Sequence, residues 1–189
     1  MNFKQNKKVI VGIFGLLALI GVAVITLISC KSKKEYAEIT PNLVSTSEIL
    51  QAFEDAKITT RFIYIPDEEY YLVTEDWVKQ MYEEFVKDAF YSKTLLYRAG
   101  GNDCDDFADY CRVFAKRYFN LNSKVKLAIT FGEFAYRPSF GDGHVINVFL
   151  IKKDNKIQIK FLEPQSGNKI ELKDLEKKDS FICYFIRIG

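Results

Sequence analysis

The stretch that decides the fold is HVINVFLIKKDNKIQIKFL, residues 144–162. It holds two runs rich in β-branched and aromatic residues, and both runs are long enough for strands. Asp154-Asn155 separates them and is interpreted as a two-residue hairpin turn, although the stronger Asn-Gly or Asp-Gly pair is absent. The pattern therefore predicts an antiparallel hairpin with strands at about 144–152 and 156–162.

This hairpin would bring a histidine and a carboxylate together. With Asp154-Asn155 as the turn, Ile146 faces Glu163, and His144 lies two residues further along on the same face. Diagonal neighbours lie about 7–8 Å apart at the backbone, a gap that long side chains bridge. The rest of the face is apolar, and partial desolvation strengthens a pairing of this kind. Its apolar members are Ile146, Val148, Leu150, Ile157, Ile159 and Phe161.

Helices are expected before the hairpin and further strands around it. Ser45-x-x-Glu48 resembles a capping box for a helix to about Ala56, and Thr74 is a candidate cap for a helix to about Phe90. A third helix is expected from Asp103 to about Tyr118, and further strands at about 61–65, 125–131 and 181–188. Helices followed by an antiparallel sheet predict an α+β fold in one domain, residues 44–189.

A nucleophilic site is predicted at the start of the third helix. Unpaired N–H groups and the helix dipole stabilise a thiolate there and lower a free-cysteine pKa of about 8.5. A thiol nucleophile needs a base, and the base needs an acceptor that orients it. Cys104, His144 and Glu163 would supply these roles in that order, and His144 is the single histidine of the chain. A cysteine can alternatively serve as a small apolar residue in the core, and this role suits Cys111 and Cys183 better than Cys104.

Four acids crowd the same helix start and oppose a thiolate, because like charge near a thiol raises its pKa. They are Asp103, Asp105, Asp106 and Asp109. Asp103 is the natural N-cap, and carboxylates at a loop–helix junction suit calcium. The alternative is ordinary acid enrichment at a helix N-terminus.

The N-terminus is interpreted as an export signal. Residues 1–8 are basic, residues 9–28 are uncharged and almost wholly apolar, and Leu27-Ile28-Ser29-Cys30 resembles a bacterial lipobox. We expect a signal peptide at 1–29, lipidation of Cys30 and a tether at 30–43. The alternative is an uncleaved membrane anchor, since about 20 apolar residues can span a bilayer. Either interpretation places residues 31–189 outside the cytoplasmic membrane, in the cell envelope.

Composition excludes several classes of protein. Removal of residues 1–29 takes away three lysines and no acids, which changes the formal net charge from +2 to −1. No basic footprint for nucleic acid remains. Four cysteines and one histidine leave no room for a Cys/His zinc cluster of the finger type. With Cys30 lipidated, three thiols remain, and at least one of them stays free or pairs between chains.

Three segments together resemble the papain-like cysteine protease group. The resemblance is closest to the agglutinin C-terminal domain family of calcium-dependent cysteine proteases. It is carried by Cys104-Asp105-Asp106-Phe107-Ala108, Gly143-His144 and Glu163-Pro164-Gln165. It implies a papain-like or transglutaminase-like fold, catalytic roles for Cys104, His144 and Glu163, and calcium held by Asp105 and Asp106.

The sequence is therefore interpreted as an envelope-anchored cysteine hydrolase that performs acyl transfer on an amide, most simply a peptide bond. Its expected partners are a peptide or protein substrate and, through Cys30, the lipid bilayer. The chemistry needs no cofactor, and calcium is the one ion suggested. A cell-wall endopeptidase and a transglutaminase-like acyl transferase share the same residue logic. A catalytically inactive binding or scaffold lipoprotein of the same fold is the alternative from another class.

Overall fold

The computed structural model describes residues 42–92, 103–125, 127–137, 142–176 and 182–189. The expected signal peptide, Cys30 and nearly all of the expected tether lie outside these ranges. Among the described residues, no helix is long and apolar enough to cross a membrane.

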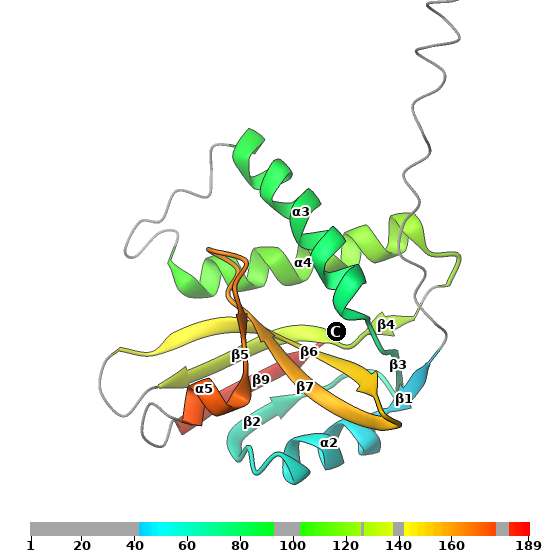
Figure 1. The fold of residues 1–189 in the computed structure, drawn as a ribbon, viewed down its shortest axis with the longest axis vertical. Coiled ribbons are helices and arrows are strands. Elements are labelled where there is room, and N and C mark those ends of the chain that lie inside the picture. The colour runs from blue at the N-terminus through cyan, green and yellow to red at the C-terminus, as the bar shows by residue number, and fades with distance from the viewer. Residues whose placement is uncertain (1–41, 93–102, 126, 138–141, 177–181) are drawn as a thin grey trace, which may run out of the picture. The chain divides into compact units, whose positions relative to one another are not determined.

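The described chain forms two sheets and four helices (Figure 1). The larger sheet has the order β2 (Thr60–Tyr64), β9 (Ile182–Ile188), β5 (Phe131–Arg137), β6 (His144–Lys153), β7 (Lys156–Leu162) and β8 (Lys169–Ile170). The smaller sheet has the order β1 (Leu43–Ser45), β3 (Glu69–Tyr71) and β4 (Ala128–Ile129). The helices are α2 (Thr46–Asp55), α3 (Glu75–Ser92), α4 (Cys104–Asn122) and α5 (Leu172–Glu176).

Both sheets are mixed, and this corrects the expected α+β order of helices followed by an antiparallel sheet. β2 pairs parallel with β9, and β3 pairs parallel with β4. Three strands, β1 to β3, also precede the two long helices. The strand at β2 was predicted, but its partner follows more than a hundred residues later, and local alternation says nothing about such a pairing.

The predicted hairpin register is confirmed. Lys153 pairs with Lys156 and Val148 with Phe161, as a two-residue turn at Asp154-Asn155 requires. The turn residues have φ of 52° and 58°, the left-handed conformation of a type I′ turn. Antiparallel pairing then continues through β5, which lies on the other side of β6.

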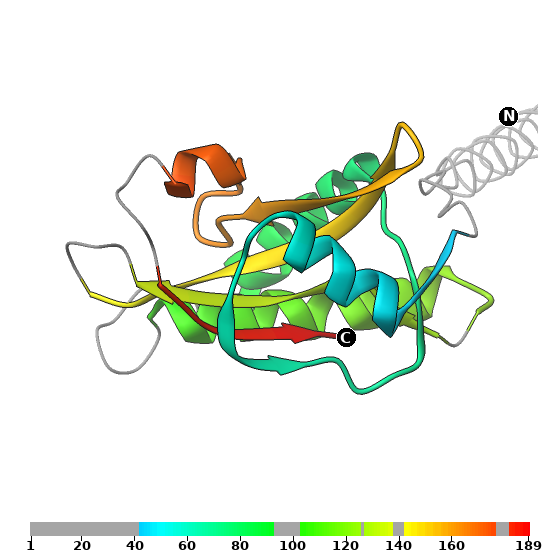
Figure 2. The same cartoon turned by 90° about the horizontal axis from the view of Figure 1, so that it is seen from below.

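Each face of the larger sheet packs against helices. α3 and α4 cover one face, as Figure 1 shows, and α2 covers the other (Figure 2). On the first of these faces, Trp77, Met81 and Phe85 of α3 are buried against α4 and the sheet. The apolar face predicted for the hairpin packs on the α2 side, where Ile146, Val148, Leu150 and Phe161 are fully buried.

The helix starts follow the predicted caps. The Ser45 N–H donates to Glu48 Oε2 at 2.8 Å, which completes the capping box of α2. The Trp77 N–H donates to Thr74 Oγ1 at the start of α3. Asp103 precedes α4, and its N–H donates to Asp106 Oδ2 at 3.3 Å. α4 therefore begins at Cys104, and this fixes where the thiol lies.

Candidate functional site

His144 and Glu163 form a direct hydrogen bond at the end of the β6–β7 hairpin. His144 Nε2–H donates to Glu163 Oε2 at 2.7 Å. Both side chains are partly buried, with 31% of the His144 side chain and 17% of the Glu163 side chain exposed. A proton fixed on Nε2 leaves Nδ1 of the neutral ring as an acceptor. Tyr136 packs edge-on against the ring, with 5.8 Å between the ring centroids.

Cys104 lies beside this pair. It is the first residue of α4, and its sulfur accepts a hydrogen bond from the main-chain N–H of Val145, the residue after His144. The thiol is partly exposed, whereas Cys111 and Cys183 are buried. The three predicted site residues are therefore brought to one region, where the start of α4 meets the start of β6.

A buried asparagine holds α4 against β6 next to the thiol. Asn147 Nδ2 donates to the main-chain oxygen of Ala108, one helical turn after Cys104. It also donates to the main-chain oxygen of Gly132 on β5, with 2.9 Å for each bond. Asn147 is fully buried. Asn147 lies between Ile146 and Val148, so its side chain is on the face of β6 opposite the apolar face of the hairpin. This amide within an otherwise apolar part of the strand is a signal that the sequence analysis did not use.

The local electrostatics do not favour a thiolate at rest. Burial raises the pKa of the Cys104 thiol, and the negative charges of Asp105 and Asp103 raise it further. The hydrogen bond from the Val145 N–H opposes this shift. The predicted lowering by the helix N-terminus is thus outweighed, because desolvation and like charge act together.

All three cysteines in the described part of the chain are free. Burial also raises the pKa of Cys111 and of Cys183. Cys111 is in the core between α3, α4 and the sheet, and Cys183 is in the core on the α2 side. Both match the small buried apolar residue expected from the sequence, and Cys104 is distinguished from them by its exposure.

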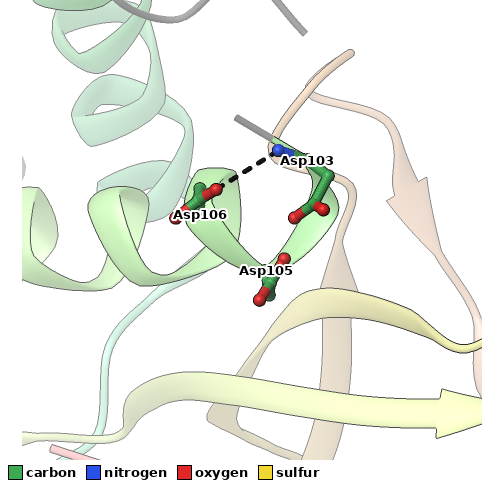
Figure 3. A group of neighbouring side chains, drawn as sticks. All are labelled: Asp103, Asp105 and Asp106. Atoms are coloured by element: carbon green, nitrogen blue, oxygen red, sulfur yellow. Dashed lines mark hydrogen bonds between the residues drawn. The ribbon is translucent and has the colours of Figure 1, made fainter. Parts of the chain in front are cut away.

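The acids at the start of α4 form a compact cluster. One carboxylate oxygen from each of Asp103, Asp105 and Asp106 lies within 4.8 Å of the others (Figure 3). A hydrogen bond with the Asp103 carboxyl, together with burial, raises the pKa of Asp105. The donor set is all oxygen, as a hard cation such as calcium prefers. The expected ligands Asp105 and Asp106 therefore fit such an ion, together with Asp103.

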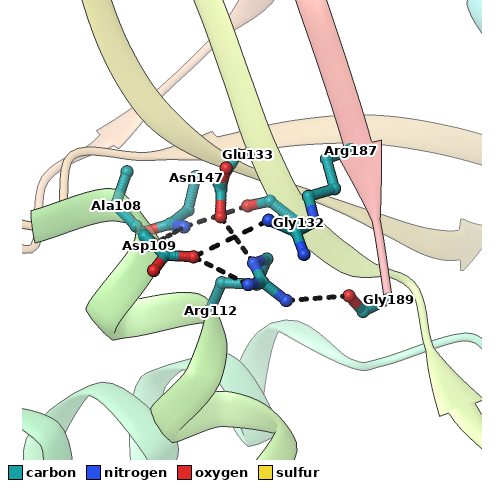
Figure 4. Close-up of polar contacts among 8 residues, drawn as sticks. All are labelled: Ala108, Asp109, Arg112, Gly132, Glu133, Asn147, Arg187 and Gly189. Carbon is teal, nitrogen blue, oxygen red and sulfur yellow. Dashed lines mark hydrogen bonds and ion pairs between the residues drawn. The ribbon is translucent and has the colours of Figure 1, made fainter. Parts of the chain in front are cut away.

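Asp109 does not join that cluster but an ionic network centred on Arg112. Arg112 donates to Glu133, to Asp109 Oδ1 and to the main-chain oxygen of Gly189 (Figure 4). Arg112 and Glu133 are buried, so each charge needs its partners. The network joins α4 to β5 and β9 and is structural. Asp109 is three residues from Arg112 on the same helix, but Glu133 and Gly189 lie 21 and 77 residues away. No local pattern predicts these two distant partners.

The fold is a pair of mixed sheets with helices on both faces of the larger one, and it carries a helix-borne thiol beside a His–Glu pair. Solved structures of a lectin share this fold. One is described as the PSL1a-E64 complex, with a TM-score of 0.63, and covers 77% of this chain and 50% of the matched chain. Another is the Polyporus squamosus lectin bound to the human-type influenza-binding epitope Neu5Aca2-6Galb1-4GlcNAc, with a TM-score of 0.62 and cover of 77% and 49%. Both are 21% identical in sequence to this chain.

This likeness establishes the fold alone. The chain spans about half the length of the lectin chains it matches. No protein-family model and no curated protein matches it.

The comparisons correct the family expected from the sequence. The matched structures are those of a lectin, and neither description names a papain-like protease. The papain-like assignment is therefore withdrawn, together with the cysteine hydrolase activity and the peptide or protein substrate that it implied. Its motifs are short segments around Cys104, His144 and Glu163, and short segments do not define a whole fold. The arrangement of these three residues stands: His144 is hydrogen-bonded to Glu163, and Cys104 lies beside the pair.

Proposed function

We propose that this domain binds a ligand through a reactive thiol, with Cys104 as the nucleophile, His144 as its base and Glu163 as the acceptor that orients the ring. The observation that carries the proposal is the 2.7 Å hydrogen bond from His144 Nε2–H to Glu163 Oε2. This bond leaves Nδ1 of His144 able to accept a proton. The Cys104 sulfur lies close by, because it accepts a hydrogen bond from the main-chain N–H of Val145, the residue that follows His144.

The chemical step follows from these roles. Nδ1 of His144 takes the thiol proton, and the sulfur forms a bond to an electrophilic carbon of the ligand. The bond from that carbon to its leaving atom breaks, and the electron pair departs with the leaving atom. The Glu163 carboxylate stabilises the imidazolium that forms. Since the pKa of Cys104 is raised at rest, the base is essential to this step.

Alkylation with iodoacetamide tests the proposal, because the sulfur displaces iodide and mass spectrometry locates the adduct. We expect Cys104 to react at least about tenfold faster than the buried Cys111 and Cys183 in the folded protein. His144→Ala should slow the reaction of Cys104 by about tenfold or more, since positioned bases contribute factors of this size. An unchanged Cys104 rate in a folded His144→Ala variant would contradict the proposal.

E64 supplies a second probe, since a matched structure is described as its complex. E64 carries an epoxide, and opening of that ring forms a carbon–sulfur bond while the oxygen takes the proton from the imidazolium. We expect one E64 per chain, attached at Cys104 and absent in Cys104→Ser. An adduct at Cys111 or Cys183 instead would contradict the assignment of the nucleophile.

Carbohydrate binding is a second candidate, favoured by the lectin structure bound to Neu5Aca2-6Galb1-4GlcNAc. Titration of that glycan by calorimetry tests it. Heat that saturates at one site, and that persists in Cys104→Ser, would support a glycan site independent of the thiol. No saturable heat at millimolar glycan would contradict this candidate. The two candidates are thus separated by one variant.

We also propose that the domain is held at the outer side of the cytoplasmic membrane by lipid on Cys30. The support is the basic start, the apolar run and the tetrad that ends at that cysteine. The full chain expressed in bacteria should partition into detergent with a mass that includes the lipid. The Cys30→Ala variant should lack the mass of the lipid. If the unaltered chain also lacks that mass, lipidation of Cys30 is contradicted.

A further inference from the structure

We propose that Tyr82 of α3 is a positioning residue for this thiol site, a role that rests on the proposed function. It holds the turn after β7 in place, so that the Glu163 carboxylate stays against the His144 ring. Tyr82 touches neither the thiol nor a ligand in this assignment, and it acts through Glu163.

The orientation of Glu163 depends on a tight turn that follows it. The Gly167 N–H donates to the Glu163 main-chain oxygen at 2.7 Å, and the Glu163 N–H donates to the Asn168 main-chain oxygen at 2.9 Å. The Gln165 N–H donates to Glu163 Oε1, the carboxylate oxygen that His144 does not use. A shift of this turn would therefore change where the carboxylate points.

Tyr82 contacts the turn in two ways. Its hydroxyl donates to the main-chain oxygen of Pro164, the residue after Glu163, at 3.1 Å. Its ring lies over Gly167, where an added Cβ would come within 2.3 Å of a ring carbon. Gly167 has φ of +73°, so the turn needs glycine both for its backbone conformation and for the approach of the ring.

The Tyr82 hydroxyl keeps its proton, and so can donate a hydrogen bond, at every pH used in the proposed experiments. Burial raises its pKa to about 12, with a smaller contribution from the negative charge of Glu163. The hydrogen bond to Pro164 therefore persists over the whole pH range in which thiol reactivity is measured. The ring also packs against Phe85, with 5.7 Å between centroids, so removal of the hydroxyl alone leaves the packing of α3 in place.

Tyr82→Phe is the test, with Tyr110→Phe as the matched control. Tyr110 lies on α4, and its hydroxyl donates to Asp88 of α3, so the control removes a tyrosine hydroxyl between the two helices and leaves the turn intact. Because His144 is the single histidine, the NMR signal of its Nε2 proton needs no assignment by mutation. That signal reports the bond to Glu163 and requires no thiol reactivity.

We expect Tyr82→Phe to speed exchange of the His144 ring proton with water and to slow alkylation of Cys104 by about two- to tenfold, the range of one lost hydrogen bond. Tyr110→Phe should change neither. An unchanged ring proton in folded Tyr82→Phe would overturn the positioning role. If that variant unfolds, Gly167→Ala, which displaces the ring from the other side, should give the same two changes, and an unchanged ring proton there would overturn the role equally.

Failure of the proposed function and failure of the positioning role of Tyr82 give different results. An alkylation rate of Cys104 that is the same in His144→Ala and in the unaltered chain would overturn the reactive-thiol function. The ring-proton signal of His144 in the Tyr82→Phe variant would still report whether Tyr82 holds Glu163 in place.

Discussion

His144 and Glu163 are 19 residues apart in the chain, yet their side chains are joined at 2.7 Å. The reason is local, because the two residues lie at the open end of one hairpin whose strands pair without a bulge from Asn147–Leu162 to Lys153–Lys156. A shift of one residue would place the ring and the carboxylate on opposite faces. Cys104 reaches the same place differently, through the packing of α4 on β6.

The hairpin turn should be open to stabilisation at Asn155. Its φ of 58° suits glycine best, and a β-branched residue there is strained. We expect Asn155→Gly to raise the free energy of unfolding by about 0.5–1 kcal/mol and Asn155→Val to lower it by about 1 kcal/mol or more. Urea denaturation of the two variants measures both. Equal stability of the valine and glycine variants would mean that the type I′ turn does not set the register.

Asn147 should be among the more costly residues to replace. It is fully buried, and Asn147→Leu removes the side-chain amide that donates to the main-chain oxygens of Ala108 and Gly132. We expect the free energy of unfolding to fall by about 2–4 kcal/mol. Asn122→Leu is the control, because Asn122 also donates to a main-chain oxygen of α4, that of Tyr118, but is exposed to water. A loss of similar size in both variants would show that burial of the bridge is unimportant.

The elements that sequence analysis predicted well are those whose causes are local. The capping box at Ser45 and Glu48, the cap at Thr74 and the hairpin register each depend on residues a few positions apart. The buried residues Trp77, Met81 and Phe85 of α3 lie four positions apart, the spacing that places side chains on one face of a helix. Local chemistry therefore sufficed to place His144 diagonally from a carboxylate on the same face of the hairpin.

The features that sequence analysis missed depend on distant partners. The parallel pairing of β2 with β9 joins chain segments more than a hundred residues apart. The ionic bond from Arg112 to Glu133 and the hydrogen bond from Tyr82 to Pro164 cross between elements. Arginine and tyrosine occur at many positions, and nothing local marks those that find a buried partner. The same reason explains why short motifs suggested a family that the comparisons do not support.

The alkylation rate of Cys104 should depend on pH in a way that reveals its surroundings. Burial and the charges of Asp103 and Asp105 raise its pKa, so the rate should keep rising above pH about 8.5, where a free cysteine is half ionised. Asp105→Asn removes one negative charge and should lower the midpoint. Asp55→Asn on α2 is the control for the same change of charge. Rates of adduct formation between pH 6 and 10 measure this, and a midpoint that moves equally in both variants would contradict the local effect.

Calcium binding at the start of α4 stays a prediction, and it can be tested through stability and through the thiol. An ion held by Asp103, Asp105 and Asp106 would bind the folded chain only, and at 100 times its Kd it would add about 2.7 kcal/mol to the free energy of unfolding. We expect calcium to raise the Tm, magnesium to raise it less, and Asp106→Asn to remove the response. The ion would also cancel the charge that opposes the thiolate, so the midpoint of Cys104 alkylation should move to lower pH. A Tm and a midpoint that are the same in calcium and in chelator would leave the three carboxylates as helix-capping groups, with Asp103 as the N-cap and Asp106 accepting from its N–H.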